Sequence, residues 1–309
     1  MKTLLFTLTF AAALHSHAKI LSFNTVDFNN KLTSEEASFN DDLAKVAKNI
    51  DAFKIAPANI HAIITPYGNN AGFDYGTNIY IPRSMQFTND WGADIVYKTT
   101  MDVVAVFSHE YGHAVFDDLL GRILPVHRQL KAIKAEISAL DLKRIQSPLN
   151  DEERKTIFEL MKQKEESITQ NKEFIRVAVL AMPYGELFAD AIAVFERDSK
   201  GAIFEALYDP NISKARNPMA YEYLAARDFS QLHELEKWTI DEPHVLFSPL
   251  RSVIGSEECW PTTNEDRAKK LKGLARMLLT DIIEKDRAKA KATIADNKSL
   301  MEKYKALCK

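Results

Sequence analysis

Two histidines four residues apart, His109 and His113, lie in an apolar stretch from Val103 to Leu120, with Glu110 between them. Residues four apart on a helix lie one turn apart on the same face, so both imidazoles can bind one metal ion. The Glu110 carboxylate then lies close enough to take a proton from a water molecule on that metal. The HExxH pattern therefore predicts a Zn²⁺ site with Glu110 as a catalytic residue.

The helix that carries this motif is predicted to be buried, because apolar residues flank the motif on both sides. Thr99, with Asp102 three residues later, fits a capping box, and Gly121 fits a left-handed terminator. A glycine inside a helix costs about 1 kcal/mol relative to alanine. We therefore expect a close neighbour over the turn that contains Gly112.

A catalytic zinc needs a third protein ligand as well as an open position for water. One known extension places a glycine three residues and a histidine six residues after the second histidine. Phe116 and Leu119 occupy these positions, which excludes that arrangement. Asp117 and Asp118 follow on the same helix, where at least one must point away from the metal.

A second acidic pair fits the site better. Glu186 and Asp190 lie four residues apart in an apolar stretch, Gly185 to Phe195, that we predict to be another buried helix beginning after Pro183. Glu186 is the predicted third metal ligand. Asp190 is the predicted acceptor for the other ring N–H of a ligand histidine, which would fix the tautomer of that histidine.

His109-Glu110-x-x-His113 followed by Glu186-x-x-x-Asp190 resembles the gluzincins, the thermolysin-like group of zincin metallopeptidases. The resemblance covers about 60–195, less a helical insertion. It implies hydrolysis of a peptide or protein substrate, and a sheet whose edge strand pairs with the extended substrate. Two segments are candidates for that edge, Asn78 to Pro82 and Asn70 to Gly72.

The same resemblance implies a downstream histidine or tyrosine that stabilises the oxyanion of the tetrahedral intermediate. His244 is the first candidate, because Pro243 and Pro249 would restrain its loop. A histidine that only packs or caps a turn is the competing interpretation. Weaker candidates for the same role are Tyr221, Tyr223 and Arg251, and no role is assigned to His61, His127 or His233.

The order of the predicted elements indicates one mainly helical α+β domain over 19–309. A first helix is expected from Ser34 to Phe53, and two short strands, Ile60–Thr65 and Asn78–Pro82, form a small sheet before the zincin active-site helix. A charged segment, 125–173, has apolar residues at near-heptad spacing on both sides of a break at 147–150, which predicts an inserted helical hairpin. The last part, 262–309, is predicted to be helical.

The first eighteen residues have the features of a secretory signal peptide: a basic start at Lys2, an apolar run from Leu4 to Leu14, and a small-x-small site at 16–18. We expect export to the periplasm or the extracellular space, with no integral membrane segment after signal removal. Cys259 and Cys308 then suggest a disulfide that ties the C-terminal tail to the domain, with two free thiols as the alternative.

The net charge of −3 over 309 residues gives no field that would attract nucleic acid, and we expect no nucleic-acid partner. Two functions compete with a secreted zinc peptidase. One is a non-catalytic interaction protein that binds a protein partner through the hairpin, although a structural arm is the simpler interpretation of that segment. The other is a zinc amidase that acts on cell-wall peptides. The presence of Glu110 favours an enzyme, since an inert scaffold does not need it.

Overall fold

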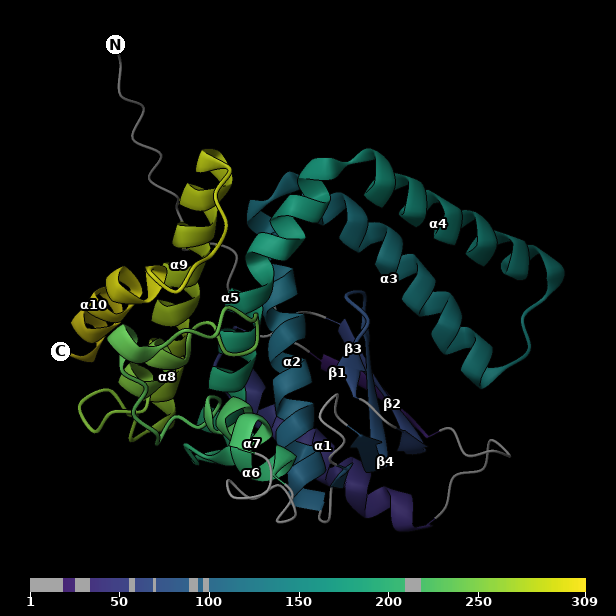
Figure 1. The fold of residues 1–309 in the computed structure, drawn as a ribbon. Coiled ribbons are helices and arrows are strands. Elements are labelled where there is room, and N and C mark those ends of the chain that lie inside the picture. Colours follow the sequence, from purple (N-terminus) through teal and green to yellow (C-terminus); the bar gives the residue numbers. More distant parts are fainter. Residues whose placement is uncertain are drawn as a thin grey trace.

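The fold combines a small mixed sheet, a body of helices and a long helical arm (Figure 1). The computed structural model describes residues 19–25, 34–55, 59–68, 71–88, 94–96, 100–208 and 218–309. This arrangement confirms the predicted mainly helical α+β class. The predicted signal peptide, 1–18, and the capping residue Thr99 lie outside the described residues.

The sheet is built on two long parallel strands, β2 (Asn59–Gly68) and β4 (Asn78–Thr88), in which Ile63 is opposite Tyr80. β1 (Lys19–Thr25) adds a parallel strand beside β2. β3 (Gly72–Phe73) pairs antiparallel with β4 on its other side, and β5 (Asp94–Val96) pairs with the far end of β4. Both predicted strands are therefore present, and both are longer than expected.

The structure corrects the assignment of the sheet edge. The strand order is β1-β2-β4-β3, so the segment Asn78–Pro82 lies inside the sheet rather than at its edge. β3 is the edge strand on that side of the sheet. This agrees with the other candidate segment, Asn70 to Gly72, of which Asn70 lies outside the described residues. Proline has no backbone N–H to donate and is usually confined to the edges of sheets, so Pro82 is unusual at this position. It is tolerated here because the pairing of β3 with β4 ends at Tyr80.

Helices α1 (Ser34–Ala52) and α2 (Thr100–Ile123) begin the helical body, and α1 matches its predicted range closely. The expected left-handed terminator at Gly121 is wrong, because α2 continues through it to Ile123. The helix ends where Leu124 takes an extended conformation just before Pro125. A residue that precedes proline is disfavoured in the helical region, which explains the later stop.

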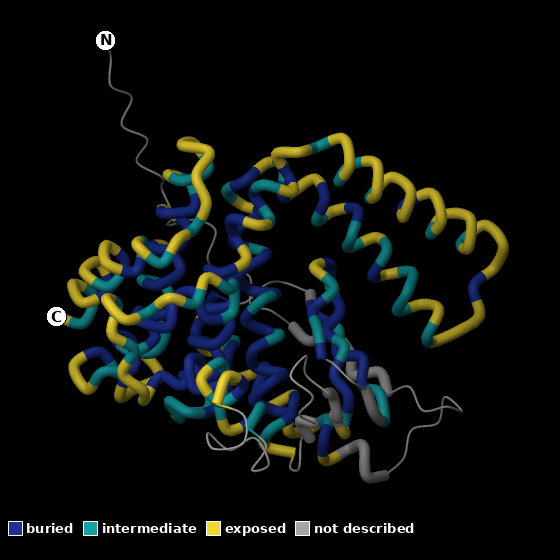
Figure 2. Tube along the Cα trace, viewed as in Figure 1, coloured by how far each residue is buried: buried dark blue, intermediate teal, exposed yellow. Residues whose placement is uncertain are grey.

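The predicted hairpin is present as α3 (Pro125–Gln146) and α4 (Asp151–Gln170), which project from the body as an arm (Figure 1). Asn150 accepts a hydrogen bond from the Glu153 N–H, and the Glu153 side chain accepts one in return from the Asn150 N–H, so a capping box starts α4. The side of the arm that faces away from the body is largely exposed (Figure 2). The inner face of the arm contributes Leu130, Ile133 and Leu160 to an apolar cluster that also contains Phe174, from the helix after the arm.

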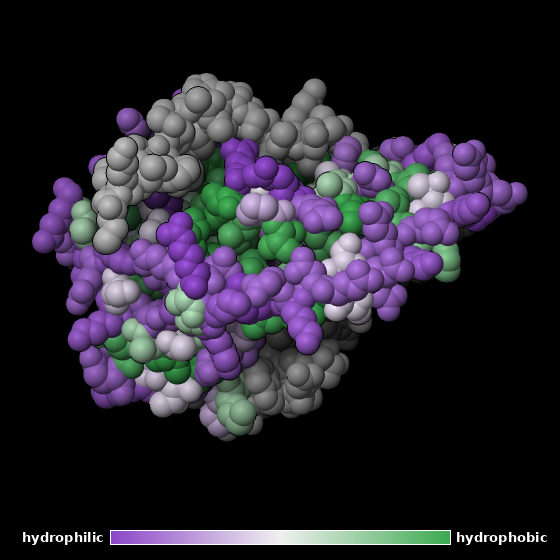
Figure 3. All heavy atoms as spheres, turned by 90° about the horizontal axis from the view of Figure 1, so that it is seen from above, coloured by the Kyte–Doolittle hydropathy of each residue, from purple (hydrophilic) through white to green (hydrophobic). Residues whose placement is uncertain are grey.

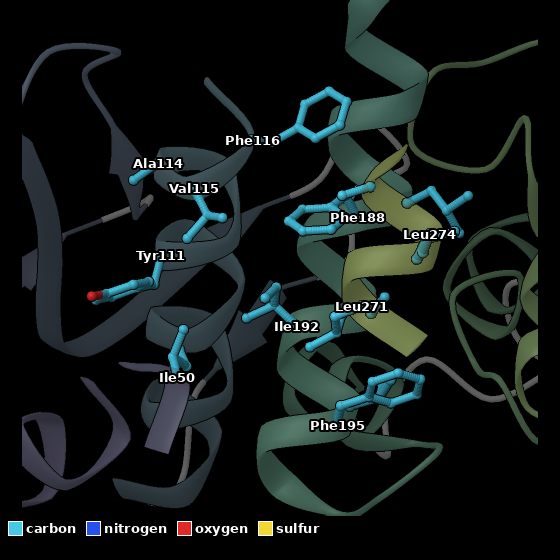
Figure 4. Packing of buried hydrophobic residues seen from close by; sticks show 14 of the residues in the cluster. Ile50, Tyr111, Ala114, Val115, Phe116, Phe188, Ile192, Phe195, Leu271 and Leu274 are labelled. Carbon is cyan, nitrogen blue, oxygen red and sulfur yellow. The ribbon is translucent and has the colours of Figure 1, made fainter. Parts of the chain in front are cut away.

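A single helix, α5 (Lys172–Arg197), follows, so the predicted break at Pro183 is wrong. A proline inside a helix costs about 3 kcal/mol, and burial of the helix on both sides of Pro183 offsets that cost. In Figure 4, Phe188 and Ile192 of α5 face Val115 and Phe116 of α2, while Leu271 approaches from α9. Among the described residues, α5 alone has the length and hydropathy of a membrane span, but 83% of its apolar window is buried inside the protein.

The C-terminal part is helical, as predicted, and its disulfide is present. Cys259 and Cys308 are bonded, with their Cα atoms 4.9 Å apart, which joins the last helix to the body. Thr263 caps α9 by accepting a hydrogen bond from the Asp266 N–H. Pro249 lies in the first turn of α8, so the predicted loop of His244 ends where the chain becomes helical at Ser248. The helices of this part are α6 (Ala202–Leu207), α7 (Pro218–Ala225), the 3-10 helix η1 (Leu235–Lys237), α8 (Ser248–Ile254), α9 (Asn264–Ala288) and α10 (Asp296–Cys308).

Candidate metal centre

The two helices that carry the predicted ligands, α2 and α5, pack directly against each other (Figure 4). They approach each other closely at Gly112, where an added Cβ would lie 2.6 Å from the Cα of Ala189. No side chain fits in that space. The glycine between the two histidines of α2 therefore allows the short distance between the helices. A close neighbour at this turn was expected, because a glycine inside a buried helix is otherwise unfavourable.

His109, His113 and Glu186 form a cluster that could hold a metal ion. The Nε2 atoms of the two histidines are 3.0 Å apart. Glu186 Oε1 lies 3.4 Å from His113 Nε2, and Glu186 Oε2 lies 3.6 Å from His109 Nε2. The three predicted ligands, taken from two helices, are thus brought together.

These distances fit tetrahedral coordination of one metal ion, for which zinc gives the scale. Ligand atoms about 2.0–2.1 Å from a zinc ion lie about 3.3 Å from one another at tetrahedral angles. In addition, Glu186 Oε2 is buried without a hydrogen-bond partner, an arrangement that is costly unless a cation binds there. Burial lowers the pKa of His113 despite the nearby Glu186 charge, which favours the neutral imidazole that a metal requires.

Asp190 fixes the orientation of His109, as predicted. Its Oδ1 lies 2.9 Å from His109 Nδ1, which leaves the Nε2 lone pair facing the cluster. Two arginines hold Asp190 from behind: Arg227 Nη2 is 2.5 Å from Oδ1, and Arg251 Nη2 is 2.7 Å from Oδ2. Burial alone would raise the pKa of Asp190, but the charges of these arginines hold it well below its usual range. Asp190 is therefore an ionised acceptor for His109.

Arg227 was not identified from the sequence. It lies in the turn that follows α7, 37 residues from Asp190 in the sequence. Neither its spacing nor its sequence neighbours indicate that it belongs to a site. Its Nη2 also approaches Glu186 Oε2, at 3.8 Å. Arg251, a weak candidate for the oxyanion, is fully buried and bonded to Asp190, so it supports the ligand histidine instead.

Glu110 connects the metal cluster to the sheet edge. Its Oε2 accepts a hydrogen bond of 2.9 Å from the backbone N–H of Phe73, the last residue of β3. This N–H points away from the interior of the sheet, and α2 lies beside it. The carboxylate is thereby held between the edge strand and the two ligand histidines that flank it in the sequence.

His244 reaches the same site from the loop before α8. Its Nε2 lies 3.5 Å from Glu186 Oε1, while Glu242 binds its Nδ1 at 2.6 Å and its backbone N–H at 3.0 Å. Burial alone would lower the pKa of His244, but the hydrogen bond that its ring donates to Glu242 and the charge of Glu186 raise that pKa above its usual value. Tyr223 hydrogen-bonds Glu242 behind this pair. Tyr221 packs against Phe204 instead, away from the cluster.

The alternative ligands Asp117 and Asp118 point away from the cluster and have other partners. Asp117 lies 2.6 Å from His127 Nε2, and Asp118 forms an ion pair of 2.6 Å with Arg122. Among the described residues, no second group of three acidic, histidine or cysteine side chains has metal-binding geometry. Glu186 is thus the carboxylate that the fold brings to the histidines.

Comparisons of this chain with models of protein families, with curated proteins and with solved structures find no match. Any functional assignment therefore depends on the site itself.

The close packing at Gly112 leads to a prediction. Gly112→Ala should lower stability by about 1–3 kcal/mol, the usual effect of overpacking, because its Cβ would lie 2.6 Å from a backbone atom of Ala189. It should also weaken metal binding by moving α5 away from α2. Melting temperature and zinc affinity measure the two effects.

Gly121→Ala is the matched control on the same helix. There the nearest atom to an added Cβ is the flexible Lys131 side chain at 3.4 Å. We expect unchanged zinc affinity and a gain of up to about 1 kcal/mol from helix propensity. Equal behaviour of the two variants would show that the close approach does not position the metal ligands.

Proposed function

We propose that this protein is a zinc-dependent metallopeptidase. The observation that carries the proposal is the convergence of His109, His113 and Glu186 from two helices, with Glu110 held beside them at the sheet edge. A set of two histidines and one carboxylate, which leaves a position open, is typical of catalytic zinc sites. A structural zinc site would need a fourth protein ligand instead.

Zinc bound by these residues would lower the pKa of a coordinated water and polarise the substrate carbonyl. Glu110 is the general base in this proposal: its carboxylate takes a proton from the attacking water and later gives it to the leaving amine. The hydrogen bond from the Phe73 N–H holds Oε2, which leaves Oε1 to accept the proton. Asp190 keeps the proton of His109 on Nδ1, so that Nε2 remains a ligand.

His244 is the proposed oxyanion-stabilising residue. Its Nδ1 is bound by Glu242, so its Nε2 is directed toward Glu186 and the metal ligands. Its raised pKa favours an N–H at Nε2 that can donate to the carbonyl oxygen as negative charge develops there. The Glu242 hydrogen bonds also restrain the ring, so that little reorganisation is needed during the reaction.

The outer edge of β3 is the proposed binding strand for the peptide backbone. It is the edge strand next to the catalytic glutamate, and main-chain hydrogen bonds to such an edge hold a substrate in an extended form. We also propose that the protein is exported. The Cys259–Cys308 disulfide supports this, because disulfides persist mainly in oxidising compartments.

The direct test is incubation of the zinc-loaded protein with casein and, separately, with peptidoglycan fragments. We expect casein to be cleaved, a zinc chelator to stop the cleavage, and added zinc to restore it. Release of peptides from peptidoglycan fragments alone would replace the proposal with a cell-wall amidase. Cleavage of neither substrate by protein that retains zinc would favour a non-catalytic interaction protein.

A further inference from the structure

The backbone group that holds Glu110 belongs to a very short strand. β3 consists only of Gly72 and Phe73, and the Phe73 N–H donates the hydrogen bond of 2.9 Å to Glu110 Oε2. A pairing of two residues is too short to fix a strand firmly by itself, since strands usually have three or more residues. The position of Phe73 therefore depends on what holds the turn that follows it, residues 74–77.

Asp74 closes this turn. Its Oδ1 accepts hydrogen bonds from the backbone N–H groups of Gly76, at 2.8 Å, and Asn78, at 3.0 Å. Its own N–H donates to the Asn78 carbonyl at 3.1 Å. Because Asp74 directly follows Phe73 in the chain, a displacement of Asp74 moves Phe73 with it.

The turn has a strained conformation that α3 supports. Tyr75 has a φ of 59°, in the left-handed region. A residue other than glycine in this region costs on the order of 1–3 kcal/mol and persists only where its surroundings hold it. Lys134 Nζ of α3 lies 4.5 Å from the centre of the Tyr75 ring, and an added Cβ at Gly76 would lie 2.7 Å from the Lys134 carbonyl oxygen. The turn is thus packed closely against the arm.

The side chain of Ser138, on α3, connects the arm to Asp74. Ser138 Oγ donates a hydrogen bond of 2.6 Å to Asp74 Oδ2 and accepts one of 3.3 Å from the Thr77 N–H. The Asn78 side chain donates a hydrogen bond of 3.0 Å to the Ser138 carbonyl. Ser138 is 2% exposed and Asn78 is fully buried, so water does not replace these bonds easily. We call Asp74, Ser138 and Asn78 the arm joint.

The apolar contacts of the arm lie elsewhere. Leu130, Ile133 and Leu160 pack with Phe174 at the start of α5, which ties the arm to the helical body. Figure 3 shows, from above, the arm as a mainly hydrophilic projection with hydrophobic atoms gathered beside its base. The arm joint connects the arm to the sheet through polar groups instead.

We propose that the helical arm positions the general base: Ser138, acting through Asp74, holds the turn after β3 and thereby the Phe73 N–H that orients the Glu110 carboxylate. The proposal rests on the proposed peptidase function. Ser138 and Asp74 are positioning residues, since they act on Glu110 through the backbone of β3. Without the arm joint, Phe73 shifts and Glu110 no longer points steadily at the water that it deprotonates. The inserted hairpin is therefore part of the catalytic apparatus and more than a structural arm.

The first test is Ser138→Ala, which removes the hydroxyl that bonds Asp74. We expect kcat for a quenched fluorescent peptide to fall by about 10- to 100-fold, the usual effect of a misplaced catalytic group. Zinc content should stay normal, because no metal ligand changes. Thr169→Val is the matched control: it removes a hydroxyl of the same arm that bonds only carbonyls of its own helix, and kcat should stay near that of the wild type. An unchanged kcat in Ser138→Ala overturns the proposal.

The second test separates positioning of Glu110 from a general structural effect. In protein that already carries Glu110→Gln, Ser138→Ala should change the remaining kcat by no more than about 2-fold, because the group that Ser138 positions can no longer act. A loss by the same factor with and without Glu110 overturns the proposal. Asp74→Asn, which keeps an oxygen for the turn and an amide for Ser138, gives the same comparison with a smaller loss if Ser138→Ala does not fold.

Amide hydrogen exchange tests the connection without catalysis. In the substrate-free protein, Ser138→Ala should raise the exchange rate of the Phe73 N–H by about 10-fold or more, because local opening becomes easier. The amides of β2 should exchange as in the wild type, and Thr169→Val should change neither. If the wild-type protein cleaves no peptide, the proposed function fails, while this measurement still decides whether the arm holds Phe73. Unchanged exchange at Phe73 overturns the proposal in either case.

Discussion

Replacing Glu110 with glutamine is expected to leave the protein folded and able to bind zinc, while peptide hydrolysis falls by about 10²–10⁴-fold, the usual contribution of a general base. The amide oxygen of glutamine can still accept the 2.9 Å hydrogen bond from the Phe73 N–H, so β3 should keep its position. The amide cannot take a proton from the attacking water. Zinc content and casein cleavage of the same preparation measure the two parts of this result.

Asp118→Asn is the matched control for Glu110→Gln. It removes one negative charge from the same helix, at a residue that pairs with Arg122 and Lys131 and does not face the metal ligands. Its activity should stay near that of the wild type. Undiminished hydrolysis by Glu110→Gln would show that Glu110 is not the general base. Loss of zinc from this variant would instead mean that Glu110 has a role in the metal site.

The sequence predicted those elements whose signals are local. The hairpin followed from apolar spacing and from the break at 147–150, and in the structure the second helix of the arm begins there with the Asn150 capping box. The buried α2 helix and its close neighbour at Gly112 followed from the apolar flanks of the motif. The sequence signals for these features lie within one or two turns, so one segment contains the information needed to predict them.

Predictions failed where tertiary packing outweighed a local preference. Pro183 is a helix breaker by itself, yet α5 passes through it because one face of the helix before Pro183 and nearly all of the helix after it are buried. Gly121 has the residue type of a terminator, but it lies inside α2 under the side chain of Lys131. The position of Pro82 suggested an edge strand, and only the pairing of β4 with two neighbours shows that it is not one.

The three residues that could hold a metal ion were predicted, but the residues that support them were predicted only in part. The pairs His109–His113 and Glu186–Asp190 each have helical spacing, which can be read from one sequence. Arg227 has no such pattern: its contact with Asp190 spans 37 residues and depends on where the turn after α7 lies relative to α5. Long-range ion pairs of this kind become visible only when the fold is known.

Replacing Glu186 with alanine is expected to reduce zinc affinity on the order of 10²-fold or more, since even the loss of a residue that only orients a ligand costs 10–100-fold. Two histidines would remain, with no carboxylate at 3.4–3.6 Å from their Nε2 atoms. The change also removes the counter-charge that faces Arg227 at 3.8 Å, so we expect some loss of stability in the metal-free protein. Zinc content after dialysis and competition with a chelator of known affinity measure the main effect.

Glu173→Ala tests the same chemical change in the exposed first turn of the same helix, where Glu173 pairs with Arg176, and it should keep full zinc content. Glu186→Gln keeps the shape of the side chain and separates the loss of a charged ligand from the loss of packing; its zinc affinity should lie between those of the wild type and the alanine variant. Full zinc occupancy in Glu186→Ala would contradict the ligand set. His244, 3.5 Å from Glu186 Oε1, would then be the nearest remaining candidate for the third ligand, because Asp117 and Asp118 face other partners.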